Sequence, residues 1–143
     1  MRKVKRWKYY CDFCKKSGGH AGYMREHELS CTMNPNRRCG LCDYGEGTEA
    51  AIEDLKKPLL SLAERVHEDE WGSLQIIGMI DGEMEGALEE LREVSGDCPA
   101  CILAALRQTN LAWAFMDIFD FKKEKDAIFA GHNREHTEAI GGY

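Results

Sequence analysis

The sequence predicts a mainly α fold in which a small metal-stabilised module docks on a compact helical domain. Six of the seven cysteines form three C-x2-C pairs, a spacing that is typical of structural zinc sites. Apolar residues recur every three or four positions over 52–66 and again over 77–94, which is the period of an amphipathic helix. With 143 residues, the chain can bury one modest core and hold a small module beside it.

The first cysteine pair begins a set of four potential metal ligands with the spacing C-x2-C-x12-H-x3-C. Two cysteines separated by two residues can bind one metal from a tight turn. A histidine and a cysteine four positions apart face the same side of a helix. We therefore expect one zinc ion to be bound by the first cluster, which consists of Cys11, Cys14, His27 and Cys31.

The other two pairs supply a second cluster of four thiols, Cys39, Cys42, Cys98 and Cys101. The two clusters give eight ligands, enough for two four-coordinate zinc ions with no thiol left over. A zinc ion here would close a loop of roughly sixty residues and hold the helical domain to the module. Gly40 would permit the sharp turn between its neighbours, and Pro99 at the first helical position would place Cys98 at the N-cap.

Two alternatives remain for the third cysteine pair. Cys98 and Cys101 could form a thioredoxin-type redox dithiol, which requires a preceding strand and a parallel sheet, or they could be free structural thiols. The odd number of cysteines and their pairing argue against a disulfide framework. We therefore expect a reducing, cytoplasmic compartment.

Residues 9–31 resemble a CCHC variant of the classical zinc finger, a hairpin packed on a helix. Tyr9 matches the aromatic residue two positions before the first ligand, and Met24 matches the apolar residue three before the histidine. The chain departs from the family at Gly18, where the family has a core aromatic, so we expect a less well packed hairpin. The positions that the family uses for base contacts fall on weak base-contacting residues, His20, Tyr23 and Glu26.

The finger and its continuation through residues 34–42 loosely resemble small uncharacterised zinc-finger proteins of bacteriophages. This resemblance implies a viral source and, in that case, the host cytoplasm. Residues 34–38 contain an Asn-Pro-Asn sequence that predicts a turn between the two clusters. We divide the chain into a basic arm, zinc finger and zinc knuckle over 1–44 and an acidic helical domain over 45–143.

Charge distinguishes these two parts. Residues 1–38 contain ten Lys or Arg and three acids, whereas residues 39–143 contain nine Lys or Arg and twenty-two acids. We expect the basic part to bind a nucleic acid and the acidic helices to bind a protein partner. The alternative is that the acidic residues only solvate the exposed faces of the helices. No apolar run approaches the roughly 18 residues that span a bilayer, so we expect no membrane association. The oligomeric state is left open.

The basic part would contact nucleic acid mainly through phosphates, with Trp7 of the arm stacking on a base. The alternative for residues 1–8 is a frayed, solubilising terminus. The cations that we expect at the phosphates are Arg2, Lys3, Lys5, Arg6, Lys8, Lys15, Lys16, Arg25, Arg37 and Arg38.

Two apolar stripes predict the helices that form the core. The first consists of Ile52, Leu55, Leu59, Leu62 and Val66. Thr48 is its expected N-cap, and Pro58 must kink this helix or begin a new one. The second stripe consists of Ile77, Ile80, Met84, Leu88, Leu91 and Val94, with regular helix expected from about Asp81 because glycines weaken its early part.

The closing segment is rich in aromatic residues, most of which we expect in the core. They are Trp113, Phe115, Phe119, Phe121 and Phe129. Asp120 is the expected cap of a last helix over 122–129. His132 and His136 could form half of a metal site, but an exposed tail is the favoured interpretation.

The sequence contains none of the motifs that would indicate an enzyme, such as a Gly-rich phosphate loop, G-x-S-x-G or H-E-x-x-H. Four-ligand zinc sites also leave no coordination position for a substrate. We therefore expect a non-enzymatic protein. It is either a nucleic-acid-associated accessory protein or a zinc-stabilised adaptor or inhibitor that binds a protein through the acidic helices.

Overall fold

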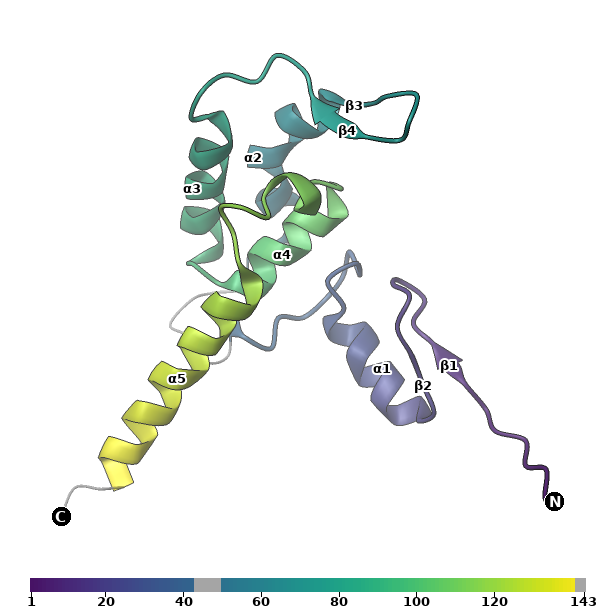
Figure 1. The fold of residues 1–143 in the computed structure, drawn as a ribbon. Coiled ribbons are helices and arrows are strands. Elements are labelled where there is room, and N and C mark those ends of the chain that lie inside the picture. The colour runs from purple at the N-terminus through teal and green to yellow at the C-terminus, as the bar shows by residue number, and fades with distance from the viewer. Residues whose placement is uncertain (43–49, 141–143) are drawn as a thin grey trace.

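The computed structural model describes residues 1–42 and 50–140, and for residues 132–140 it describes the backbone alone. The fold is mainly α, as the sequence predicts, with two small antiparallel hairpins. Figure 1 shows the finger and the basic arm on one side and helices α2 to α5 on the other. In chain order the elements are β1 (Tyr9–Tyr10), β2 (Ser17–Gly18), α1 (Ala21–Ser30), α2 (Ile52–Glu64), β3 (Val66–Glu68), β4 (Leu74–Ile76), α3 (Glu83–Ser95), α4 (Pro99–Gln108), the 3₁₀ turn η2 (Ala112–Ala114) and α5 (Phe121–Ile140).

The N-terminal module has the hairpin-and-helix arrangement that its resemblance implies. Strand β1 pairs with β2 so that Tyr9 lies opposite Gly18, and α1 packs against both strands. The module's small core consists of Cys11, Met24 and Cys31. The Cε atom of Met24 lies 3.9 Å from the position that a Cβ on Gly18 would occupy. A methionine therefore fills part of the space left by the missing aromatic residue.

Helix α4 is the centre of the helical domain. It packs against α2, α3 and α5, and most of its residues are buried, Ile102 completely. Leu59 of α2 and Leu91 of α3 are also fully buried, as the two apolar stripes predict. Each such side chain contributes roughly 1.5–3 kcal/mol through burial, so this core is the main source of stability outside the clusters.

Helix α2 is continuous through Pro58, so the proline does not start a new helix. It begins at Ile52 with Ala51 at the N-cap, later than expected, and Thr48 lies outside the described residues. The helix ends at Glu64, and Val66 lies in strand β3 rather than on the helical stripe. Val66 still packs against the core. Its apolar side chain therefore matches the spacing of the helical stripe although the residue lies in a strand.

The early part of the second stripe lies outside regular helix, as its glycines led us to expect, but the hairpin before it was not predicted. Residues 66–76 form the hairpin β3–β4, and Ile77 and Ile80 are 58% and 72% exposed. Glycines at positions 72, 78 and 82 have positive φ angles, a backbone conformation that favours turns over helix. The helix α3 begins at Glu83, close to the predicted start, and Glu83 forms an ion pair with Arg65 that closes this segment.

The last helix, α5, begins at Phe121, and Asp120 caps it as predicted. The Asp120 side chain accepts a hydrogen bond of 3.1 Å from the backbone N–H of Lys123. The helix is longer than predicted and projects from the helical domain (Figure 1). Phe115 and Phe119 are buried, but Trp113, Phe121 and Phe129 are only half-buried.

His132 and His136, which we expected in an exposed tail, lie in α5, and their side chains lie outside the described residues. The predicted domain boundary between residues 44 and 45 also lies outside the described residues.

The module contacts the helical domain through the end of α4. The side-chain amide of Gln108 donates hydrogen bonds to the backbone carbonyls of Thr32 (2.9 Å) and Asn34 (3.0 Å). Arg107 donates a hydrogen bond of 2.9 Å to the Thr32 hydroxyl. Asn34 is itself buried, and its side chain donates to the carbonyl of Glu28 and accepts from the N–H of Asn36. The turn predicted between the clusters is therefore also the surface on which the two parts meet.

Candidate metal centres

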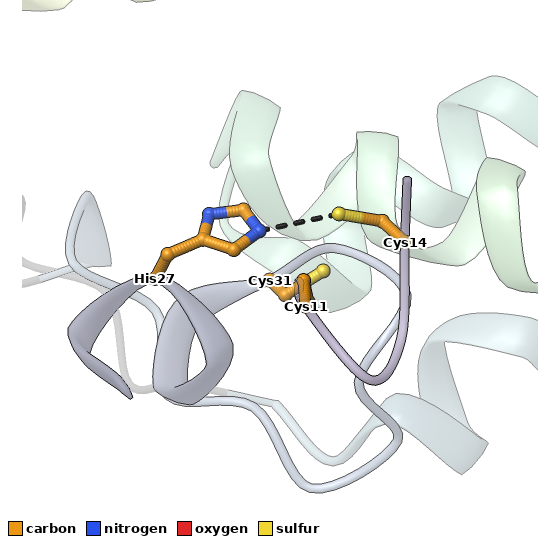
Figure 2. Close-up of side chains that lie close together, drawn as sticks. All are labelled: Cys11, Cys14, His27 and Cys31. Carbon is orange, nitrogen blue, oxygen red and sulfur yellow. Dashed lines mark hydrogen bonds between the residues drawn. The ribbon is translucent and has the colours of Figure 1, made fainter. Parts of the chain in front are cut away.

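The first cluster is assembled by the hairpin and helix of the finger. Cys11 follows β1, His27 lies in the last turn of α1, and Cys31 is the C-cap of that helix. The four ligand atoms lie within 4.8 Å of one another, and Figure 2 shows their side chains converging on one point. Cys14 Sγ and His27 Nε2 are 3.2 Å apart. The module thus places three sulfurs and one imidazole nitrogen around one position.

Backbone amides support the sulfurs of the first cluster. The N–H of Phe13 donates to Cys11 Sγ, and the N–H of Lys16 donates to Cys14 Sγ, each at 3.4 Å. These bonds orient the sulfurs and offset part of the negative charge of thiolates. Burial opposes ionisation of Cys11, but hydrogen bonds from the Phe13 and Cys14 amides and from neighbouring thiols lower its pKa below the usual value.

Cys31 and His27 differ in whether they must lose a proton before they can bind a metal. Burial raises the pKa of Cys31 to about 11, so zinc must displace its proton. Burial and the nearby cation of Lys16 lower the pKa of His27. A lowered pKa favours the neutral imidazole, which is the form that binds metal.

The second cluster joins segments that are far apart in the chain. The sulfur of Cys39 lies 3.4 Å from that of Cys98, and the sulfur of Cys42 lies 3.6 Å from that of Cys101. All four ligand atoms lie within 4.8 Å of one another. Cys98 is the N-cap of α4 and Pro99 its first residue, as predicted, although the Cys98 side chain forms no capping hydrogen bond. Gly40 does not have a positive φ angle, so the turn between Cys39 and Cys42 does not require glycine.

Both clusters fit tetrahedral zinc. Four sulfurs at about 2.3 Å from a zinc ion lie about 3.8 Å apart, close to the sulfur distances in the second cluster. These distances are far too long for disulfide bonds, and none of the seven cysteines forms a disulfide. The chain therefore has one CCHC and one CCCC cluster, each positioned to hold one metal ion, consistent with two zinc ions.

The redox alternative for Cys98 and Cys101 lacks its structural context. Residues 93–95, which would have to form the preceding strand, lie in helix α3. Across residues 1–42 and 50–140, the sheets are two antiparallel hairpins. The two thiols instead lie among the thiols of Cys39 and Cys42.

Metal-free thiols at these distances share protons. Hydrogen bonds from Cys101 and Cys98 lower the pKa of Cys39, whereas burial raises the pKa of Cys42 to about 12. The hydrogen bonds of Cys101 to Cys39 and Cys98 raise the Cys101 pKa strongly. One thiolate is thus stabilised by protonated neighbours, and a divalent cation would allow the other thiols to ionise as well.

Arg37 lies beside the second cluster. Its Nη1 atom is 3.9 Å from Cys101 Sγ, and its Nε atom is buried with no hydrogen-bond partner among the described residues. Four thiolates around one zinc ion carry a net charge of −2, which a guanidinium group at this distance partly offsets. The residue that we expected at a phosphate therefore lies beside the second cluster, where it would offset charge if a metal were bound.

The other cations predicted to contact nucleic acid lie on the surface. Those of the arm have no regular secondary structure, and all except Arg37 are exposed: Arg2, Lys3, Lys5, Arg6, Lys8, Lys15, Lys16, Arg25 and Arg38. Lys16 lies over the ring of Tyr23, 5.0 Å from its centroid. The structure brings Arg37 to the second cluster and leaves the rest distributed along the arm and the finger.

The residues that position the two clusters relative to each other could not be recognised from the sequence. Gln108 and Thr32 belong to no recognisable sequence motif, because a hydrogen bond between distant segments requires no particular spacing in the sequence. Asn34 offered a signal, since the Asn-Pro turn implies that its side chain hydrogen-bonds to nearby backbone. Its buried position between the two parts could not be inferred from that signal.

Comparisons of the chain with protein-family models, with curated proteins and with solved structures find no match. Among the described helices, none is both long enough and apolar enough to cross a membrane.

Proposed function

We propose that the protein is a non-enzymatic zinc-binding accessory protein that associates with nucleic acid through residues 1–38. In each cluster four protein ligands surround the metal position, which leaves no coordination position for a substrate. Zinc would then hold the shape of the module, and the exposed side chains around it would make the contacts. A viral source remains part of this proposal and rests on the resemblance of the finger and residues 34–42 alone.

The observation that carries this proposal is the exposed, unpaired cationic surface of the arm and finger. The ion pairs found among the described residues involve none of the cations of residues 1–38. Aromatic rings lie among them: Trp7 is 83% exposed, and Lys8 lies 5.6 Å from the ring centroid of Tyr10. Cations that neutralise phosphates and rings that stack on bases are the usual elements of sequence-tolerant nucleic-acid binding.

Salt dependence of binding tests the proposal on the full zinc-loaded chain. Removing four arm cations (Arg2→Ala, Lys3→Ala, Lys5→Ala and Arg6→Ala together) should lower the slope of log affinity against log salt by about 0.7–0.9 for each phosphate that is no longer neutralised. The arm has no regular structure, so these changes leave the finger intact. Lys57→Ala, on the exposed side of α2, is the control and should leave the slope unchanged. Absence of DNA and RNA binding even at low salt would refute the proposal.

A second candidate function is a protein adaptor or inhibitor, favoured by exposed apolar residues in and after the β3–β4 hairpin. Trp71 is 86% exposed, and Ile77 and Ile80 are also exposed. Exposed tryptophan is enriched at protein interaction sites. The acidic residues 68–70 beside Trp71 would favour a basic partner.

Photo-crosslinking in the producing cell separates the two candidates. A crosslinking amino acid at position 71 should yield a discrete protein adduct if the adaptor function holds, whereas one at position 7 should yield nucleic-acid adducts if the favoured function holds. Position 113, where Trp113 is half-buried, serves as the matched aromatic control.

A further inference from the structure

A groove of about 750 Å³ lies where the finger, the second cluster and α5 meet. Ser30 and Thr32 line it from the end of the finger, Arg37 lines it from beside the second cluster, and Phe121, Lys125 and Phe129 line it from α5. Its volume is within the range of sites that hold small organic groups, roughly 300–1,000 Å³.

The charges at the groove are complementary to an anion. None of the described residues that line it is acidic, although the chain as a whole has a net charge of −6. Lys125 forms no ion pair with the other described residues, and the neighbouring carboxylate of Glu124 is engaged by Arg92 at 2.5 Å. The Thr32 hydroxyl accepts from Arg107 and keeps its own hydrogen to donate.

Aromatic rings flank the cation of the groove. Phe121, Lys125 and Phe129 are spaced by four residues along α5 and therefore lie on one face of the helix. The ammonium group of Lys125 is 5.5 Å from the ring centroid of Phe121. Both phenylalanines are only half-buried, so the groove presents aromatic and cationic groups side by side.

From this arrangement we infer that the groove binds a single-stranded nucleic-acid segment, with its phosphate at Lys125 and a base against the phenylalanine rings. This inference rests on the proposed function and extends the contact surface from the finger to α5. Base stacking on aromatic side chains requires unpaired bases, because the bases of a duplex are stacked on one another. A single strand of DNA or RNA is therefore the occupant, and a duplex is not.

The test uses the full zinc-loaded chain, labelled oligothymidylate and oligouridylate of about 15 nucleotides, and a duplex of similar length. Lys125→Ala should lower the salt slope for the single strands by about 0.7 and weaken binding about fivefold at 0.1 M salt. The matched control is Lys123→Ala, an exposed lysine on the opposite face of α5, which should change neither value.

A second variant, Phe129→Leu, removes a ring while keeping an apolar side chain in the groove. It should weaken single-strand binding at least about fivefold without changing the salt slope, because stacking displaces no counterions. Zinc content and circular dichroism of each variant verify that it is folded.

Equal effects of Lys125→Ala and Lys123→Ala, or no effect of Phe129→Leu, would overturn the groove assignment while leaving nucleic-acid binding by the finger intact. Duplex binding as tight as single-strand binding would also overturn it. No binding of any of the three probes by the wild-type chain would contradict both this inference and the proposed function.

Discussion

The two clusters hold their ligands equally close together but gather them from very different spans of chain. The first cluster draws on residues 11–31, and the buried core around it consists of two of its own cysteines and Met24. The second cluster brings residues 39 and 42 to residues 98 and 101, and three of its cysteines are part of the main core with Leu59, Leu91 and Ile102. The first is a local site, whereas the second joins distant segments.

Because of this difference, a structural metal would stabilise the two parts of the chain in different ways. A short segment with so small a core cannot offset its conformational entropy by burial, so the metal supplies most of its folding free energy. The helical domain has a core of its own, and a metal at the second cluster restricts the chain across a long loop. The two sites should therefore respond differently to loss of metal.

Removal of all zinc by a chelator should have the largest effect. The finger should unfold completely, since structural zinc contributes on the order of 10 kcal/mol to modules of this kind, whereas the helical domain should retain helix but melt at a lower temperature. Far-UV circular dichroism melts with and without chelator measure both changes. An unchanged melting temperature would mean that the second cluster does not support the helices.

Cys98→Ser should have the next largest effect. It removes a buried ligand at the N-terminus of α4, and loss of the metal should destabilise the helical domain by more than about 4 kcal/mol. Denaturant unfolding followed by circular dichroism measures this value. A loss below about 1 kcal/mol would show that the core alone stabilises the domain.

Cys14→Ser is the matched substitution in the first cluster and should affect the helical domain much less. The finger should unfold, but α2, α3 and α4 should lose no more than the roughly 2 kcal/mol that the hydrogen bonds of Gln108 to the module contribute, because the two cores are separate. Hydrogen exchange of the α4 amides measures the difference. Equal loss of protection in the two cysteine variants would contradict the comparison.

Gln108→Ala should have the smallest effect. It removes two hydrogen bonds between α4 and the module, each contributing about 1 kcal/mol, while both metal ions stay bound. Gln75→Ala, at an exposed position of β4, is the control. NMR of the Thr32 and Asn34 region should report a loosened contact only in the Gln108 variant, and identical spectra would show that this contact does not hold the module in place.

The sequence was sufficient for features that local chemistry dictates. Cysteine spacing predicted both clusters, Pro99 predicted the start of α4, and Asp120 predicted the start of α5. The first stripe was extended too far, because Val66 fits a helical period but lies in β3. The glycines predicted that regular helix begins only near Asp81, but nothing predicted that residues 66–76 form a hairpin. A pattern of side chains could not reveal this, because the backbone conformation there depends on turns and on the Arg65–Glu83 ion pair.

Features that depend on the meeting of distant segments were also beyond the sequence. The contact of Gln108 with Asn34 and the position of Arg37 beside Cys101 follow from the way α4 meets the module. Most aromatic residues of the closing segment were expected in the core; Phe121 does pack against it, but Phe121 and Phe129 also line the groove. Hydrophobicity alone does not distinguish a core residue from one that lines a partly open groove.

Zinc content per chain tests the central claim most directly. Native mass spectrometry of the wild-type chain should find two zinc ions, and the Cys14→Ser and Cys98→Ser variants should each retain one. One zinc ion in the wild type, with none lost in Cys98→Ser, would show that the second cluster binds no metal and would contradict the account.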